Sequence, residues 1–138
     1  MDNQDQSYEF RGKIAFIFPN KDGETPVLNF NPDSDGFVRM NVGIAFVDLD
    51  ASSAYLPMLK LYGPSGDNVL RPMNNFAAVP VSMIDPEKRT SFLSVRLAFP
   101  VTESGIYRFE CSLLQMLQKT VDVKDILFNI LIQEQHDE

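Results

Sequence analysis

The feature that most constrains this chain is the strict alternation of residue types in the segment 38–46. Every second position there is a large apolar residue: Val38, Met40, Val42, Ile44 and Phe46. Successive side chains of a β-strand point to opposite faces, whereas one face of a helix recurs every three or four residues. The segment therefore predicts a β-strand with one buried face.

Similar patterns recur along the chain and predict further strands. In the first of them, we expect Ile14, Phe16 and Phe18 to share one face with Tyr8 and Phe10. Segments rich in Gly, Pro, Asn and Asp separate the patterns about every ten residues, a spacing typical of β-sandwiches. The expected strands lie at 8–18, 26–30 (an edge strand), 38–46, 58–62, 69–70, 76–84, 93–99, 107–113 and 126–132.

These eight or nine strands predict an all-β fold, an antiparallel β-sandwich. The segment Ser112 to Val121 leaves three alternatives open: a continued strand, a long hairpin or one short helix. A length of 138 residues with 44% hydrophobic and 22% charged residues suits one globular domain over 1–138. We expect its polar ends, 1–6 and 133–138, to be frayed.

The single cysteine, Cys111, excludes a disulfide within the chain. The first residues lack a signal-peptide pattern, and no apolar run approaches the 18 residues of a membrane span. These features predict a cytoplasmic protein that does not enter a membrane.

The net charge of −7 disfavours direct nucleic-acid binding, because phosphate backbones repel such a chain. Acidity alone favours no single function. It suits a mimic of nucleic acid or a binder of basic partners, and it also keeps ordinary proteins soluble.

The stretch Glu103-x-Gly105-x-Tyr107-x-Phe109 carries a family resemblance. It resembles the tyrosine corner of immunoglobulin-like domains, in which a tyrosine hydroxyl bonds back to the backbone. The resemblance implies that Tyr107 has this structural role and that Gly105 supplies the tight backbone. Phe109 stands where that family has a cysteine, and the chain has no tryptophan. The succession of strand patterns and turns along the whole chain is also similar to that of small uncharacterised bacterial and phage β-sandwich proteins.

The loop at residues 31–36 has the residue pattern of the first half of a calcium-binding loop. Asn31, Asp33 and Asp35 occupy alternate positions before Gly36, as the first three ligands of such a loop do. The twelfth position, however, is Val42, where a bidentate glutamate is required. We therefore predict an ordinary polar turn and no metal.

No residue set in the sequence points to catalysis or to a cofactor. The only histidine, His136, lies near the C-terminus, where a rigid catalytic base is hard to build. Cys111 alternates with Tyr107 and Phe109, so we expect a buried thiol that packs as a small hydrophobe. The sequence thus predicts that the protein is not an enzyme.

Three aromatic residues fit the strand pattern poorly: Tyr55, Phe76 and Phe92. We predict that they form a contact surface, and that the chain is a protein-binding or accessory module, with self-association as one version. Two alternatives remain at this point. One is an acidic inhibitor that mimics nucleic acid, and the other is a ligand carrier or enzyme with a barrel-like cavity.

Overall fold

The computed structural model describes residues 12–22, 25–70, 79–116 and 119–133. These ranges contain seven strands and one 3₁₀ turn. In chain order they are β1 (Lys13–Asn20), β2 (Asn29–Phe30), β3 (Phe37–Val47), β4 (Tyr55–Tyr62), η2 (Val81–Met83), β5 (Ser91–Pro100), β6 (Gly105–Gln115) and β7 (Lys119–Ile130).

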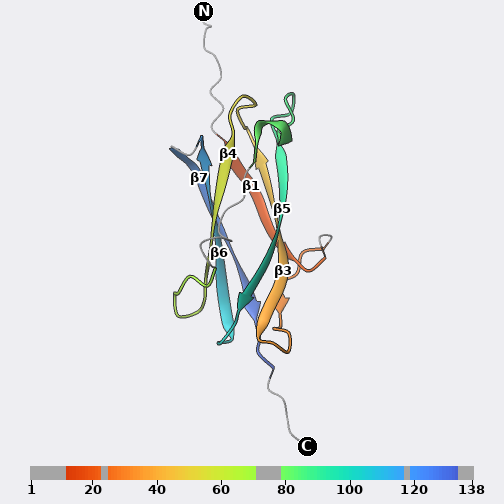
Figure 1. The fold of residues 1–138 in the computed structure, drawn as a ribbon, viewed down its shortest axis with the longest axis vertical. Coiled ribbons are helices and arrows are strands. Elements are labelled where there is room, and N and C mark those ends of the chain that lie inside the picture. The colour runs from red at the N-terminus through yellow and green to blue at the C-terminus, as the bar shows by residue number, and fades with distance from the viewer. Residues whose placement is uncertain (1–11, 23–24, 71–78, 117–118, 134–138) are drawn as a thin grey trace, which may run out of the picture.

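The strands form two sheets that pack face to face (Figure 1). One sheet has the strand order β1-β3-β5, and the other has the order β2-β7-β6-β4. This arrangement confirms the predicted all-β sandwich. The described part of the chain has no apolar helix of the length needed to cross a membrane.

The pairing is antiparallel except at one edge. Strands β1 and β5 flank β3, and β7 and β4 flank β6, all in antiparallel register. At the edge of the four-stranded sheet, β2 runs parallel to β7, with Asn29 opposite Asn129 and Phe30 opposite Ile130. The sandwich is therefore antiparallel, as predicted, apart from this one short parallel pair. The two strands are far apart in sequence, so no hairpin imposes the antiparallel direction.

The core lies between the sheets and consists of the inward positions of the alternating strands. Every predicted inward residue of β3 is buried, and so are the alternate residues of β6 from Tyr107 to Leu113. Aromatic rings pack against one another in this core: the centroids of Phe30 and Phe128 lie 5.4 Å apart with an edge-to-face geometry. The Tyr107 ring stacks on Phe128 at 6.3 Å, a spacing favourable for aromatic pairs.

The strands expected at 69–70 and 76–84 are not formed by the described residues there, 69–70 and 79–84. The described ranges therefore contain seven strands, where eight or nine were expected. Val69 donates one backbone hydrogen bond to Leu61, and Val79 forms only an isolated bridge with Tyr55. Pro80 has no N–H to donate to a ladder, and the residues after it turn into η2.

The open segment from Ser112 to Val121 belongs to a hairpin. Strand β6 continues to Gln115 and β7 begins at Lys119, so the hairpin alternative is correct and the helical one is wrong. The register of the pair shifts between Leu113 and Leu114, a bulge that places Val121 outside the regular pairing.

Candidate interaction surface

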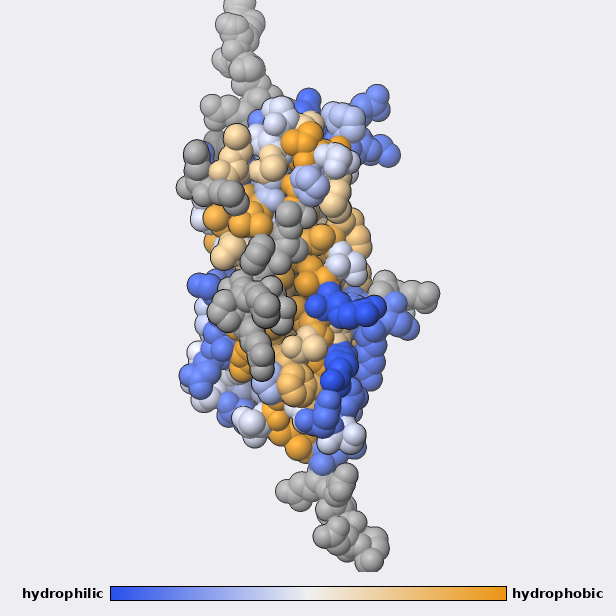
Figure 2. All heavy atoms as spheres, viewed as in Figure 1, coloured by the Kyte–Doolittle hydropathy of each residue, from blue (hydrophilic) through white to orange (hydrophobic). Residues whose placement is uncertain are grey.

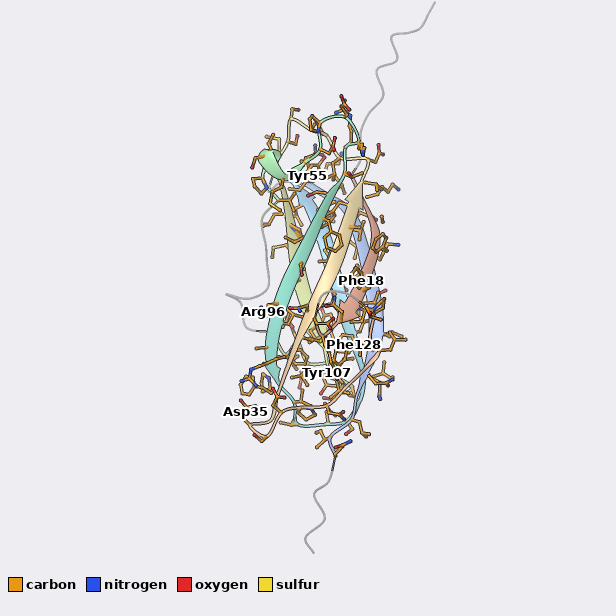
Figure 3. The ribbon with its side chains drawn as sticks, turned by 90° about the vertical axis from the view of Figure 1, so that its right-hand side faces the viewer. Phe18, Asp35, Tyr55, Arg96, Tyr107 and Phe128 are labelled. Carbon is orange, nitrogen blue, oxygen red and sulfur yellow. The ribbon has the colours of Figure 1, made fainter. Side chains whose placement is uncertain are left out.

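An exposed aromatic cluster lies on the outer face of the three-stranded sheet. It consists of Phe16 and Phe18 of β1 and Phe92 of β5. Phe16 and Phe92 are 53% and 51% exposed. The Phe18 ring centroid lies 6.1 Å from that of each of the other two, and its plane is inclined by 28° to that of Phe92. Figure 3 views the molecule from the side of this sheet and labels Phe18.

Gly43 allows the cluster to cross the central strand. A Cβ atom at Gly43 would lie 2.5 Å from Cε1 of Phe18 and 3.0 Å from Cζ of Phe92. The two rings therefore occupy the space above the Gly43 backbone and meet over β3. A glycine within a strand often marks such a close approach.

A β-bulge in β1 places Phe16 and Phe18 on the outer face of the sheet. The prediction that Ile14, Phe16 and Phe18 share a face is wrong, because the register of β1 against β3 shifts between Ile14 and Phe16. One extra residue, Ala15, moves every following side chain to the opposite face. Ile14 and Ile17 consequently point into the core, and Phe16 is exposed.

Beside the cluster is a shallow hollow of about 270 Å³ lined by Lys21, Arg39, Asn41 and Arg96. Asn41 of β3 lies opposite Arg96 of β5, and its amide donates to the carbonyl oxygen of Lys21 at 3.0 Å. Arg96 is labelled on this sheet in Figure 3. We call the outer side of β1, β3 and β5, with Phe16, Phe18, Phe92, Lys21 and Arg96, the aromatic–basic face.

The charge of this sheet is opposite to that of the whole chain. Strands β1, β3 and β5 contain three cationic residues, Lys13, Arg39 and Arg96, and no aspartate or glutamate. The chain as a whole carries a net charge of −7. The carboxylates are therefore excluded from the three strands of this face.

The outer face of the other sheet has a different character. Its central cation, Arg108, lies 2.9 Å from Glu110 and 3.2 Å from Asp125, and it covers the Tyr62 ring at 4.4 Å. Arg108 is thus satisfied by its own chain. Exposed apolar residues, among them Leu127 at 57%, lie along these strands. Figure 2, in the view of Figure 1 with the two sheets side by side, shows apolar surface along the middle of the molecule.

In the calcium-like loop, Arg39 forms ion pairs with two of the candidate ligands. The Arg39 guanidinium lies 2.8 Å from Asp33 and 2.7 Å from Asp35, and its hydrogen bond lowers the pKa of the Asp35 carboxyl. The Asn31 amide is directed elsewhere and donates to the Leu131 carbonyl at 2.8 Å. Within the described ranges, no group of three His, Cys, Asp or Glu residues is arranged to hold a metal ion.

The three predicted contact residues have different positions. Tyr55 is only 2% exposed, and its hydroxyl accepts a hydrogen bond from the Asp50 backbone N–H at 2.7 Å. It belongs to the core, so its assignment to the surface is wrong. Phe76 lies outside the described residues. Phe92 is exposed within the aromatic cluster.

Sequence reasoning missed Phe16 and Phe18 as surface residues. The available signal was the change of pattern at residues 15–18, where apolar residues become consecutive. Two apolar faces in one strand are compatible with a bulge, but alternation alone does not locate the extra residue.

In the stretch from Glu103 to Tyr107, the first and last residues are hydrogen-bonded to each other. The Tyr107 hydroxyl donates to the Glu103 carbonyl oxygen at 2.8 Å. Gly105 has a φ of 143°, and a Cβ atom there would lie 2.8 Å from Cγ of Pro64. Both restraints favour glycine at this position.

Cys111 is fully buried, and burial raises the pKa of its thiol to about 12. A thiol that stays protonated at neutral pH is a poor nucleophile. The only histidine of the sequence, His136, lies outside the described residues.

Solved structures share the fold of this chain. A glycosyl hydrolase family 2 member from Bacteroides cellulosilyticus matches 86% of the chain with a TM-score of 0.62 and 14% identity. An adhesin from Mobiluncus mulieris matches 87% with a TM-score of 0.58 and 11% identity. A protein solved by the Northeast Structural Genomics Consortium matches 96% with a TM-score of 0.51 and 10% identity.

The extent of these matches differs. The chain spans 15% of the hydrolase, 57% of the adhesin and 98% of the structural-genomics protein. No family model matches the chain, and no curated protein matches it by sequence. At such low identities, the likenesses show the β-sandwich fold and leave the activity to be argued from the surface.

Proposed function

We propose that this protein is a non-enzymatic binding or accessory module that engages a protein partner through the aromatic–basic face. The observation that carries the proposal is the exposed cluster of Phe16, Phe18 and Phe92, assembled over Gly43. Aromatic residues and arginine are enriched in protein interfaces and dominate their energetics. This cluster has arginine beside it on the same sheet.

The cluster supplies a useful binding energy. Burial of a whole phenylalanine side chain contributes about 1.5–3 kcal/mol. Phe16 and Phe92 are each half exposed, so covering both adds roughly 1.5–3 kcal/mol in total. Because the rings already contact one another, little side-chain freedom remains to be lost when a partner binds.

The acidic-mimic alternative receives no support from the arrangement of carboxylates. Most of the described acidic residues lie in loops, and those in strands belong to β6 and β7. Asp33 and Asp35 are paired with Arg39, and Glu110 and Asp125 with Arg108. Four of the described carboxylates are therefore neutralised by arginines of the same chain.

The carrier and enzyme alternatives are also less favoured. The two sheets are separate instead of closing into the barrel that a lipocalin-like cavity needs. The glycosyl hydrolase match covers 15% of that chain, so it gives no reason to assign hydrolase chemistry to this domain. The described ranges also offer no rigid arrangement of nucleophile and base.

We further propose that Tyr107 and Gly105 form the counterpart of the immunoglobulin-like tyrosine corner. The support is the hydrogen bond from the Tyr107 hydroxyl to the Glu103 carbonyl, together with the positive φ of Gly105. In this proposal both residues have a structural role, fixing the turn between β5 and β6, and neither contacts the partner.

Affinity capture from the native host, with mass spectrometry, tests the binding function. The tagged protein is compared with Phe92→Ser and Gly43→Ala, which disturb the cluster, and with Leu127→Ser as the control. Leu127 is as exposed as Phe92 but lies in the other sheet. We expect a protein captured by the wild type and the control and lost with both cluster variants. Equal capture by all four would contradict the proposed face.

A further inference from the structure

Arg96 differs from the other arginines of the strands. Arg39 of β3 is paired with two carboxylates, and Arg108 of β6 is paired with two others. The guanidinium of Arg96 makes no ion pair or hydrogen bond with any described residue, although the chain is acidic. Its charge is directed into the shallow hollow beside the aromatic cluster.

No acidic residue lines the hollow, and the third cation of its lining, Arg39, is occupied by Asp33 and Asp35. Arg96 and Lys21 carry only N–H donors, and they lie on either side of Asn41. The three strands of this sheet supply no carboxylate. A carboxylate from another molecule complements this set, because guanidinium groups bind carboxylates through paired, charge-assisted hydrogen bonds.

The spacing of Phe92 and Arg96 along β5 gives the ligand a second requirement. Phe92 and Arg96 lie four residues apart on β5 and point to the same side of the sheet. Four residues of a strand span about 13 Å. A small anion reaches only the hollow. An extended peptide has the same repeat, so its side chains four positions apart reach both groups.

We propose that the partner presents an acidic, extended segment to the aromatic–basic face. One aspartate or glutamate of the segment enters the hollow between Lys21 and Arg96, and an apolar side chain four positions away covers Phe92 and Phe18. This inference rests on the proposed binding function. It adds the chemistry of the segment and the spacing of its two anchoring side chains.

Titration with designed peptides, followed by NMR of the backbone amides, tests this assignment. The probe is a nine-residue, end-capped peptide of threonine and serine with one leucine and one glutamate four positions apart, made in both orders. Matched peptides carry glutamine or lysine in place of the glutamate. We expect at least one glutamate peptide to shift the amides of Gly43 and residues 92–96, and to bind about tenfold more tightly than its glutamine version.

Reversal of a single charge identifies the cation that binds the glutamate of the peptide. Arg96→Glu should abolish the preference for glutamate over glutamine and favour the lysine peptide instead. Lys60→Glu makes the same change of charge on β4 of the other sheet and should leave the preference unchanged. Equal binding of the glutamate and lysine peptides, shifts confined to the four-stranded sheet, or no shift with any peptide would overturn the inference.

The capture experiment distinguishes this failure from failure of the proposed function. If host capture depends on Phe92 but the peptides show no charge preference, the binding face stands and the acidic segment is wrong. If capture is indifferent to Phe92 as well, both proposals fail.

Discussion

At the scale of single residues, two polar groups lie in the core, the Tyr107 hydroxyl and the Cys111 thiol. The Tyr107 ring is almost completely buried, and its hydroxyl reaches the Glu103 carbonyl at the turn that leads into β6. The Cys111 thiol lies four residues further along β6, on the same inward face. Each is a polar atom in an apolar environment, so its removal or ionisation has a measurable effect on stability.

The Tyr107→Phe variant tests the corner. It keeps the buried ring but removes the hydrogen bond and leaves the Glu103 carbonyl without this donor. We expect the free energy of unfolding to fall by about 1–2 kcal/mol in urea denaturation. Tyr62→Phe is the control, because Tyr62 is only partly buried and its ring stays beneath Arg108. An equal loss in both variants would show that the hydrogen bond from Tyr107 to Glu103 adds nothing to the free energy of unfolding.

The Cys111 thiol makes stability depend on alkaline pH. Burial raises its pKa in the folded protein to about 12 from an ordinary value of 9.0. Above pH 9 the unfolded thiol loses its proton while the folded thiol retains it. The contribution of the protonated Cys111 thiol to the free energy of unfolding is therefore complete below pH 9. It is lost as the pH rises towards 12. Urea denaturation at several pH values should show a shallower alkaline decline for Cys111→Ala than for wild type, and parallel declines would contradict this.

At the scale of elements, alternation was a sound guide wherever a strand is regular. The segments 38–46, 93–99 and 107–113 all lie within strands whose inward residues match the predicted faces. It failed in β1, because the face of Phe16 depends on one unpaired residue, Ala15. The exposed cluster was therefore not predictable from the period alone. Its position over Gly43 depends on three strands that only the fold brings together.

Deletion of Ala15 tests the bulge. Without this residue, Ile14 and Ile17 remain inward and Phe16 and Phe18 remain outward, now in a regular ladder. We expect the variant to fold with a free energy of unfolding within about 1 kcal/mol of wild type, and to keep the exposed cluster. Deletion of Ala45 from β3 is the control. It turns Phe46 out of the core, and circular dichroism should show a loss of cooperative folding. Unfolding caused by the first deletion would contradict the assignment.

At the scale of the whole molecule, one polar contact joins the two sheets at an edge. Asp122 of β7 accepts a hydrogen bond from the backbone N–H of Ile14 in β1 at 2.8 Å, across 108 positions of sequence. Strand β1 belongs to the three-stranded sheet and β7 to the four-stranded one. The carboxylate satisfies a β1 amide at this junction, beside the hydrophobic core that lies between the sheets.

The Asp122→Ala variant tests whether this contact holds the edge closed. It leaves the Ile14 amide without its acceptor, and a hydrogen bond to a charged group contributes about 1.5–3 kcal/mol. We expect a loss of that order in urea denaturation, together with faster hydrogen exchange at Ile14. Asp125→Ala on the same strand removes a carboxylate whose ion pair with Arg108 faces outward, so it should cost less than about 1 kcal/mol and leave exchange at Ile14 unchanged. Equal exchange at Ile14 in both variants would show that apolar packing alone joins the sheets at this edge.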